Sequence, residues 1–373
     1  MAIYIDVSSA VHGKAGLGRY SESLARALLR RDPERFALFY NRGPHTWPPE
    51  GLEWVPARTL RAGYKPWRMA VWMAHLSRVS FDRMLPGAEL FHATEHLLLP
   101  LRGIPTVLTV HDMIFKLFPE HQKRLNFWYL NAAMPLYCRR ASAIITVSEW
   151  SKRDIVAHYK VDPAKITVIH EAASPEFTLA PDRLVQDARS HYGLPQRFLI
   201  HVGTIEPRKN LTRLVEALAR LRAEGLAIPL VAVGGKGWLY EDFFRKLDEL
   251  GMADLVHFPG YVPARDLPLL YNAATVAILP SVYEGFGLPL LEAMACGAPV
   301  LSSDTSSLTE IGGDAPLYFD PYDLDAMAEA IRTVWSDSAL QADMRRRGLR
   351  QAARFSWDLA AAETCAVYDS LLR

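Results

Sequence analysis

The sequence predicts an α/β fold in which two doubly wound, Rossmann-like domains follow one another along the chain. Short β-branched runs alternate with helical patterns, which is typical of parallel sheets with crossover helices. The length of 373 residues exceeds what one ordinary core holds. The alternation pauses at a polar stretch after residue 171 and then restarts. Two domains facing each other across a cleft is therefore the economical interpretation.

The first domain is expected to cover residues 1–172 and begins with a strand at 2–7. β-branched and aromatic runs mark the strands, and apolar residues three or four apart mark the helices. Further strands are expected at 36–40, 53–56, 90–94, 106–110, 143–147 and 166–170. Helices are expected between them at 18–31, 66–83, 123–140 and 148–159.

A polar segment at 173–194, with a short helix around 182–192, is the expected linker to a second domain at 195–355. The strands of this domain are expected at 198–202, 229–233, 256–258, 276–279, 300–302 and 317–319. Its helices are expected at 210–223, 239–250, 264–273, 288–296, 307–311 and 324–336. Three closing helical segments are expected to follow, the last of them at 356–372 with Ser356 as its N-cap.

The composition indicates a globular protein without a general attraction to nucleic acid. Lys and Arg number 42 against 41 Asp and Glu, and half of the residues are hydrophobic. Cys138, Cys296 and Cys365 lie far apart in apolar helical patterns, which fits buried thiols in a reducing compartment. The chain starts directly with a strand pattern and has no window of about 18 uninterrupted apolar residues. We expect a cytoplasmic protein, with peripheral attachment to the inner face of the cell membrane as the alternative.

A loop and helix at 280–296 form the central motif of the second domain. Glu284 lies on the loop and Glu292 lies two turns into the helix, with seven residues between them. The free N–H groups at the start of such a helix bind phosphate. Glu292 is suited to accept bonds from a ribose diol and Glu284 to hold sugar hydroxyls. The alternative for Glu284 alone is a helix-capping acid.

Gly203 opens the first strand-to-helix turn of the second domain, and Arg208 and Lys209 follow on the same turn. Two cations at a helix start are unfavourable because of the helix dipole. Their presence makes sense if they clamp a diphosphate, where Arg gives a planar fork and Lys a point charge. The alternative is a solvated basic turn.

In the first domain, His111 ends the strand at 106–110, where an imidazole can exchange hydrogen bonds with a sugar hydroxyl or a leaving oxygen. The alternative is a capping pair with Asp112. His92 and His96 are weaker candidates for an acceptor pocket. Gly16 and Gly18 follow the first strand and let the backbone approach a phosphate or sugar closely. A purely structural turn is the alternative.

The remaining loops give weaker signals. The loop after the strand at 256–258 places Tyr261 and Val262 where their backbone could read the edge of a nucleobase, as could the glycine-rich loop at 234–237. Asp323 and Asp325 have the form of a metal-binding acid pair, but acids at a helix start complement its dipole, and we prefer that interpretation. We therefore expect no metal site.

Together these motifs resemble the family-4, retaining, nucleotide-sugar-dependent glycosyltransferases of the GT-B fold. The resemblance spans essentially the whole chain. It is carried by Gly16-x-Gly18-Arg19-Tyr20, Val110-His111-Asp112, Thr146-Val147-Ser148-Glu149, the 203–210 turn and Glu284-x7-Glu292. The closing segment 356–373 resembles the helix with which the family crosses back onto the first domain. One departure is Glu171-Ala172-Ala173, where the family often has an Asn-Gly turn.

The resemblance implies roles for the site residues. Arg208 and Lys209 would hold the donor diphosphate with the N–H groups of Phe286, Gly287 and Leu288. Glu292 would bind the ribose, Glu284 the transferred sugar near its 3- and 4-hydroxyls, and His111 the sugar near its 6-hydroxyl. The Gly16–Gly18 loop would approach the donor phosphate and the acceptor. The family needs no cofactor or metal, and transfer is described as a front-side attack in which the departing diphosphate takes the acceptor's proton.

The residues of these motifs are most similar to those of mannosyltransferases of bacterial surface-polysaccharide assembly. A GDP-mannose donor is therefore expected, with UDP-glucose or another UDP-sugar as the second choice. The resemblance places the saccharide or lipid-linked acceptor on the first domain. There, basic residues alternate with aromatic and apolar ones at 61–83 and 123–129, which suits an anionic membrane surface. An amphipathic helix with a solvated basic face is the alternative.

Three other classes of protein stay open. A nucleotide-sugar 2-epimerase of the same fold would also use paired acids and a diphosphate site. A non-catalytic binding protein would not need all of His111, Arg208, Lys209 and both glutamates. A nicotinamide enzyme fits least, because Gly16-x-Gly18-x-x-Ser21 is followed by a second strand that ends in Tyr40-Asn41 without the acid that binds ribose.

Overall fold

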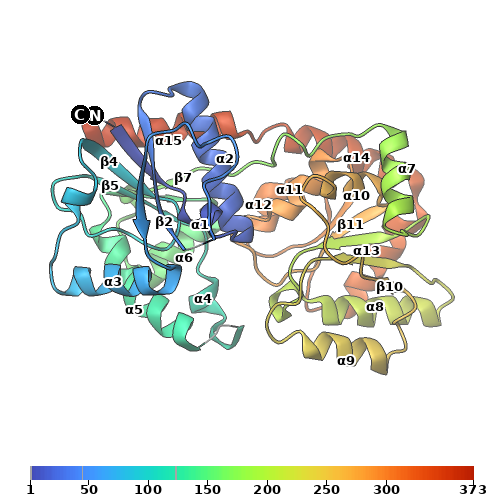
Figure 1. Cartoon of the computed structure of the whole chain (residues 1–373). Helices are drawn as coiled ribbons and strands as arrows, with labels where there is room; N and C mark the ends of the chain where they lie inside the picture. The colour runs from blue at the N-terminus through green and yellow to red at the C-terminus, as the bar shows by residue number, and fades with distance from the viewer. Residues whose placement is uncertain (1, 44, 122–123) are drawn as a thin grey trace. The chain divides into compact units, whose positions relative to one another are not determined.

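The computed structural model describes residues 2–43, 45–121 and 124–373 (Figure 1). It divides into two compact units. The first consists of Met1–Glu171 together with Ser356–Arg373, and the second is Ala172–Phe355. The expected linker at 173–194 lies within the second unit, where part of it forms a helix.

The first unit is built on a seven-stranded parallel sheet in the order β3-β2-β1-β4-β5-β6-β7. The strand order reverses between β1 and β4, and in such sheets ligands bind beside this reversal, at the carboxyl ends of the strands. The strands are β1 (Ala2–Asp6), β2 (Phe36–Arg42), β3 (Ala57–Arg61), β4 (Ala88–Ala93), β5 (Thr106–Val110), β6 (Ala143–Thr146) and β7 (Ile166–Val168).

Helices pack on this sheet, and one of them comes from the end of the chain. They are α1 (Ser8–Val11), α2 (Ala15–Arg31), α3 (Tyr64–Leu76), α4 (Ile114–Leu117), α5 (Arg124–Arg140), α6 (Glu149–Tyr159) and α15 (Trp357–Leu372), with short 3₁₀ turns η1 (Asp82–Met84), η2 (Pro119–His121) and η3 (Pro163–Lys165). The red C-terminal helix α15 lies beside the blue α2 in Figure 1. Arg30 donates to Asp358 at 2.8 Å, and Arg35 forms an ion pair with Asp369.

The second unit repeats this architecture with six parallel strands in the order β10-β9-β8-β11-β12-β13. Its strand order reverses between β8 and β11. The strands are β8 (Leu199–Val202), β9 (Leu230–Val233), β10 (Val256–His257), β11 (Val276–Leu279), β12 (Val300–Ser303) and β13 (Leu317–Phe319). The helices are α7 (Asp182–His191), η4 (Pro207–Lys209), α8 (Leu211–Ala223), α9 (Glu241–Glu249), α10 (Leu267–Ala273), α11 (Leu288–Ala295), α12 (Ser307–Gly312), α13 (Leu324–Ser336) and α14 (Ser338–Ala352).

The central strands form because their sequences can be buried on both faces. Every residue of β5, β9 and β11 is buried, as expected for parallel strands covered by helices on both sides. Helix starts are fixed by hydroxyl caps. The Ser148 hydroxyl accepts from Ser151 N–H at the start of α6, and the Ser356 hydroxyl accepts from Leu359 N–H at the start of α15.

Most expected elements are present, and strands 106–110, 276–279 and 317–319 and helix 324–336 have the expected bounds. The strand expected at 53–56 is wrong. Pro56 lacks an N–H donor, and the chain pairs with β2 only from Ala57 onwards, as an edge strand whose side chains are mostly exposed.

Three further differences concern helices. The helix expected at 66–83 ends at Leu76, because Arg78 adopts a left-handed conformation with φ 58°. Helix α1 was not expected. Two helices, α14 and α15, follow Ser336 instead of three. Helix α5 is described from Arg124, so Lys123, the first residue of the expected helix, lies outside the described residues.

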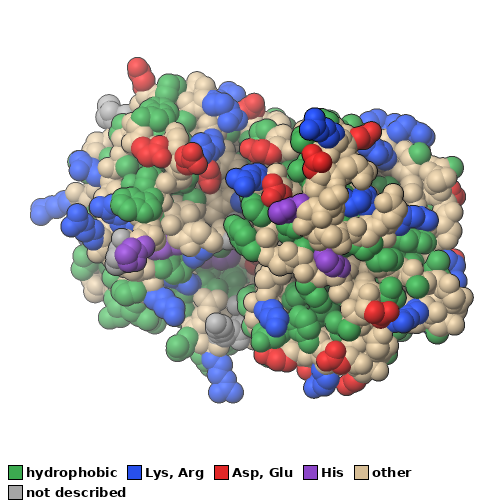
Figure 2. Space-filling view, turned by 45° about the vertical axis from the view of Figure 1, so that its right-hand side comes forward, with side chains coloured by type: hydrophobic (Ala, Val, Ile, Leu, Met, Phe, Trp, Pro, Cys, Tyr) green, Lys and Arg blue, Asp and Glu red, His purple; other side chains and the backbone are tan. Residues whose placement is uncertain are grey.

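The cysteines are free thiols, with Cys138 and Cys296 buried and Cys365 half-buried. Within the described part of the chain, no helix combines the length and the apolar character needed to cross a bilayer. On the face shown in Figure 2, basic, acidic and hydrophobic side chains lie interspersed.

Candidate functional site

Three charged residues of the second unit meet beside its strand reversal. Arg208 and Lys209 lie on η4, after β8, and Glu284 lies on the loop after β11. Arg208 Nη1 lies 2.8 Å from Glu284 Oε2, and Lys209 Nζ lies 2.6 Å from Glu284 Oε1. Arg208 Nη2 also donates to Glu206 Oε1 at 2.6 Å. We call Glu206, Arg208, Lys209 and Glu284 the ion cluster.

The ion cluster is buried, which makes its charges depend on one another. All four residues are at most 9% exposed. Burial opposes the ionisation of Glu284, but the charges of Arg208 and Lys209 outweigh it and lower the pKa of Glu284 to about 2. Burial lowers the pKa of Lys209, and the adjacent Glu284 limits that shift. Removing one partner would leave a buried charge uncompensated, which typically costs about 3–5 kcal/mol.

The loop that carries Glu284 is held from two sides. Arg208 Nη1 donates to the Tyr283 carbonyl at 2.7 Å, and Val282 N–H donates to the Arg208 carbonyl at 2.9 Å. From the other side, the Ser306 hydroxyl accepts from Glu284 N–H, and the Ser307 hydroxyl donates to the carbonyls of Glu284 and Phe286. These bonds fix the backbone of the loop at Glu284, while Arg208 and Lys209 hold its carboxylate.

Helix α11 starts directly after this loop. Gly287 is its N-cap with φ 103°, and a Cβ there would lie 2.8 Å from Leu308 Cδ2. Glycine at this position thus permits both the left-handed turn and the contact with α12. Phe286 is buried and Leu288 is half-buried, while Glu292 is buried inside α11. The helix start and the two acids expected from the sequence therefore lie on one continuous segment.

Glycines allow the loops after β8 and β9 to lie close to each other and to the ion cluster. A Cβ on Gly203 would lie 3.4 Å from Lys209 Cε, so this glycine leaves room for the lysine side chain. A Cβ on Gly234, where φ is 149°, would lie 2.1 Å from the Gly203 carbonyl oxygen. Further along the same edge, Tyr261 is 89% exposed and Val262 is half-buried.

In the first unit, His111 lies directly after β5 and is buried. Its Nδ1 lies 3.2 Å from Glu171 Oε1, and its Nε2 lies 2.9 Å from the Thr94 carbonyl oxygen. Both partners are acceptors when Glu171 is ionised, so a doubly protonated ring satisfies both contacts. Burial disfavours this cation, but Glu171 outweighs burial and raises the pKa of His111 above its ordinary value.

Gly18 lies in the expected first helix, and Gly16, which was expected on the loop before it, also lies in a helix. Gly16 and Gly18 both belong to α2. A Cβ on Gly18 would lie 3.1 Å from the Ser9 carbonyl oxygen, so Gly18 lets α2 pack against α1. Nothing lies within 4 Å of a Cβ on Gly16, which is exposed. Gly18 thus has a structural role, and Gly16 remains open to a ligand.

Two weaker candidates have structural roles. His92 is fully buried, with Nδ1 2.6 Å from the Tyr368 hydroxyl and Nε2 2.8 Å from the Thr109 hydroxyl, and burial lowers its pKa to about 3. The Asp323 carboxylate accepts from Asp325 and Ala326 N–H and caps α13, as preferred from the sequence. Among the described residues, no group of three His, Cys, Asp or Glu side chains is placed to hold a metal ion.

One cluster beside the strand reversal of the first unit was missed. Asp6 ends β1 and Glu95 follows β4, and both are buried. The Glu95 Oε2 atom accepts from the Tyr64 hydroxyl at 2.9 Å and lies 3.0 Å from Lys14 Nζ. Among the described residues, neither Asp6 Oδ2 nor Glu95 Oε1 has a hydrogen-bond partner. Burial, followed by the charge of Glu95, raises the pKa of Asp6 to about 7. The carboxylate at a strand end was the available signal.

Two family models together match most of the chain. Residues 15–177 match the model described as Glycosyltransferase Family 4, and residues 186–351 match the model described as Glycosyl transferases group 1. O-antigen chain mannosyltransferase B of Escherichia coli is 31% identical over 374 residues, covering 95% of this chain and 96% of that protein. The serotype-specific mannosyltransferase WbdA of Escherichia coli is 30% identical over 270 residues, but the match covers 69% of this chain and 33% of WbdA.

Solved structures with the GT-B fold resemble the chain over its whole length. Sucrose-phosphate synthase from Thermosynechococcus elongatus has a TM-score of 0.77 at 20% identity, covering 100% of this chain and 99% of that one. WaaG, a glycosyltransferase involved in lipopolysaccharide biosynthesis, has a TM-score of 0.71 at 18% identity, covering 98% of both chains. These likenesses agree with the two doubly wound units described above.

Proposed function

Because this chain belongs to the group 1 and family 4 glycosyltransferases, we propose that it transfers mannose from GDP-mannose to a saccharide or lipid-linked acceptor. The ion cluster carries this proposal, because it places two cations against a carboxylate beside the start of α11. The mannosyltransferase names of the relatives support the choice of sugar. Transfer with retention and without a metal is part of the proposal.

Glu284 has a different role before and after the donor binds. Without donor, it neutralises Arg208 and Lys209, both within 2.8 Å. A diphosphate would compete for the same cations, because Arg and Lys bind phosphate oxygens strongly. With the backbone of the loop still fixed, the Glu284 side chain would then turn its oxygens to the sugar hydroxyls. We infer that donor binding exchanges an internal ion pair for a ligand ion pair.

The transfer step then depends mainly on electrostatics. Arg208, Lys209 and the N–H groups at Phe286, Gly287 and Leu288 stabilise the charge that develops on the departing diphosphate. Glu292 holds the ribose, and the backbone at Tyr261 and Val262 reads the base. Both ring nitrogens of His111 face acceptors within the first unit, so its contact with the sugar near the 6-hydroxyl would require the Nε2–H group to leave the Thr94 carbonyl. The departing diphosphate takes the acceptor's proton, so none of these side chains acts as a general base.

The acceptor side of the proposal rests on the first unit. A group of polar side chains lies beside its strand reversal: Asp6, Lys14, Tyr64 and Glu95. Among the described residues, Asp6 Oδ2 and Glu95 Oε1 accept no hydrogen bond, so sugar hydroxyls could donate to them. Exposed apolar side chains of α3 and α5, including Met69, Met73, Leu125 and Trp128, lie near basic residues of the same helices. They support peripheral contact with an anionic membrane and a lipid-linked acceptor.

The residue assignments are tested with Lys209→Ala and Glu284→Ala. We expect each variant to lose at least about 100-fold in transfer rate, as measured by GDP release from GDP-mannose with acceptor extract. Glu284→Ala removes the carboxylate that the two cations share and leaves Glu206 on Arg208, so GDP binding should persist or tighten, whereas Lys209→Ala should weaken it. Arg220→Ala, which breaks a half-exposed surface pair with Asp325, is the control and should keep full activity. Wild-type turnover in either site variant would refute the assignment.

The donor is tested by a separate screen of GDP- and UDP-sugars, with thermal shift and hydrolysis as the readouts. Stabilisation and turnover with GDP-mannose are expected. A preference for UDP-sugars would refute mannose transfer from GDP-mannose and leave the glycosyltransferase assignment intact. Conversion of a nucleotide sugar into its 2-epimer would instead identify an epimerase.

A further inference from the structure

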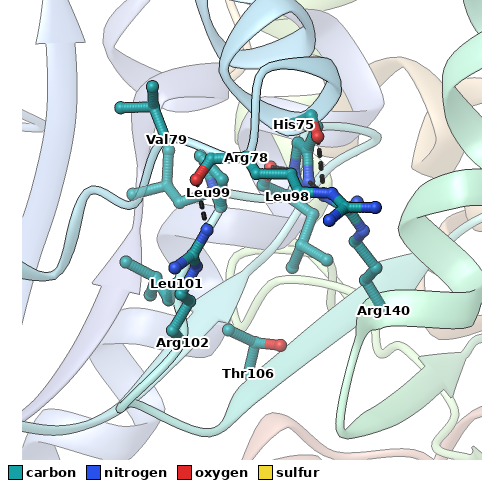
Figure 3. A pocket seen from close by; sticks show the side chains of 10 residues that line it. His75, Arg78, Val79, Leu98, Leu99, Leu101, Arg102, Thr106 and Arg140 are labelled. Atoms are coloured by element: carbon teal, nitrogen blue, oxygen red, sulfur yellow. Dashed lines mark hydrogen bonds between the residues drawn. The ribbon is translucent and has the colours of Figure 1, made fainter.

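A polar cavity lies at the opposite end of β5 from His111. It has a volume of about 270 Å³ and lies where the chain enters β5 at Thr106 (Figure 3). Its wall combines basic side chains with a short apolar segment. The lining residues are His75, Arg78, Val79, Leu98, Leu99, Pro100, Leu101, Arg102, Thr106 and Arg140. The cavity lies entirely within the first unit.

Three arginines face this cavity, and its lining contains no carboxylate. Two of them are held by backbone groups and not by acids. Arg140 Nη1 donates to the His75 carbonyl at 3.0 Å and lies 2.7 Å from His75 Nδ1. Arg102 donates to the Arg78 carbonyl, as the dashed line in Figure 3 shows. These bonds fix the guanidinium groups without neutralising them.

The charges around the cavity leave a positive excess. The C-terminal ends of α3 and α5 lie nearby, and each helix end carries about half a negative charge. The Asp82 carboxylate accepts from the N–H groups of Arg102 and Gly103 and is not part of the lining. Together these offset about two of the three arginine charges. About one positive charge remains for a ligand.

His75 does not add to this charge. Its Nε2 lies 2.8 Å from the Leu98 carbonyl oxygen, so Nε2 carries the hydrogen and Nδ1 accepts from Arg140. Burial, with a contribution from Arg140, lowers the pKa of His75 below its ordinary value. The ring therefore orients Arg140 as a neutral acceptor.

The backbone at Arg78 gives a second, independent observation. Ser77 ends α3, Arg78 follows with φ 58°, and Val79 N–H donates to the Ala74 carbonyl at 2.9 Å. This arrangement is a Schellman motif, in which the left-handed position usually holds glycine. An arginine there costs backbone energy that glycine would avoid. Such strain at a residue that lines a cavity points to a use for its side chain.

We propose that Arg78, Arg102 and Arg140 bind the phosphate group of an anionic ligand, at a site separate from the ion cluster. Guanidinium groups match the paired oxygens of phosphate. The volume admits a phosphate with a small substituent, and Val79, Leu99 and Leu101 provide apolar wall for it. A soluble phosphate ester and a phospholipid headgroup share this chemistry. The site would tether such a ligand to the first unit.

The test is isothermal titration calorimetry of the 373-residue chain with inorganic phosphate at constant ionic strength. Saturating GDP, or the Lys209→Ala background, removes phosphate binding at the ion cluster. The remaining phosphate binding then reports on the arginine-lined cavity alone, whether or not the proposed donor site is correct. We expect one saturable site that weakens at least tenfold in Arg102→Ala/Arg140→Ala. Arg139→Ala changes an exposed arginine of the same helix outside the lining and should bind as the wild type does.

Arg78→Gly separates ligand binding from folding. This variant relieves the left-handed backbone, so its midpoint of thermal unfolding should rise while phosphate binding weakens. Absence of a saturable site in the wild type, or unchanged binding in Arg78→Gly and in the double variant, would overturn the proposal.

Vesicles distinguish the two sources of phosphate. The protein is sedimented with phosphatidylglycerol vesicles and, for comparison, with phosphatidylcholine vesicles. Binding to phosphatidylglycerol vesicles that requires Arg102 and Arg140 would assign the site to a lipid headgroup. Binding of inorganic phosphate without an arginine-dependent vesicle interaction would assign it to a soluble phosphate ester.

Discussion

Glu284, Arg208 and Lys209 show how a single carboxylate can organise a buried site. The three side chains come from η4 and from the loop after β11, on either side of the strand reversal, and Glu284 pairs with each of the two cations. The sequence supplied the residue types, because two adjacent cations at a helix start and two acids around another helix start are unusual. It did not reveal that Glu284 pairs with both cations.

Asp6 was missed for a related reason. Its partner Glu95 is far away in the sequence, and neither residue belongs to a recognisable motif. The two acids become neighbours only because β1 and β4 pair in the sheet. Contacts of this kind depend on strand order, which a single sequence does not specify.

The raised pKa of Asp6, about 7 against 3.8 for the ordinary group, makes stability depend on pH. Between these values the folded protein binds a proton that the unfolded chain releases, so the free energy of unfolding falls as pH rises, by up to about 4 kcal/mol. Asp6→Asn removes this ionisation. We expect its free energy of unfolding, measured by urea titration from pH 4 to 8, to fall less with pH than that of the wild type. Equal slopes would contradict the burial of an ionisable Asp6.

The pKa of His111 tests the contact between His111 and Glu171 in the first unit. Glu171 raises this pKa against the effect of burial, so Glu171→Gln should lower it by about one unit or more. Titration of the imidazole Cε1–H signal by NMR measures the shift. Glu53→Gln, a change at an exposed position in the same unit, is the control. An unchanged pKa in Glu171→Gln would show that Glu171 does not hold the imidazolium.

At the scale of elements, burial decides which strands were predictable. β5, β9 and β11 are buried along their whole length, and their apolar runs mark them. β3 is an edge strand with two arginines and little burial, so it gives no apolar signal and was placed four residues too early. The end of α3 was missed because Arg78 adopts a conformation that normally belongs to glycine.

Two neighbouring glycines after β9 should respond very differently to substitution. Gly234→Ala would place a Cβ 2.1 Å from the Gly203 carbonyl oxygen at a φ of 149°, and the backbone cannot move away cheaply. We expect it to destabilise the second unit by more than about 3 kcal/mol. Gly235→Ala, where nothing lies within 4 Å of the Cβ, should change stability by less than about 0.5 kcal/mol. Urea unfolding of both variants compares them, and equal effects would contradict the close approach of the two loops.

At the scale of the whole molecule, the last helix completes the first unit. Trp357, Ala361, Thr364 and Tyr368 of α15 are buried there, and the Tyr368 hydroxyl bonds the buried His92. The resemblance to a known family was needed to expect this return, because no local pattern in 356–373 says which unit the helix will join.

Removal of residues 356–373 should therefore damage the first unit and spare the second. We expect the first unit of the truncated chain to unfold below its normal temperature, as measured by scanning calorimetry. GDP should still bind through the ion cluster, as measured by titration calorimetry. Tyr368→Phe, which deletes only the hydroxyl bonded to His92, should cost about 1–3 kcal/mol. Removal of Arg373 alone is the control. Loss of GDP binding together with the first unit would show that the two units do not fold separately.

The return of α15 also bears on how the protein is made. Residues up to 171 leave the ribosome before the second unit does, yet their unit includes a helix that is synthesised after the second unit. Domains generally fold as they emerge, so the second unit can reach its final structure while the first still lacks α15. The surface of α2 that α15 covers stays exposed for the whole of that interval, and the first unit is completed after the second.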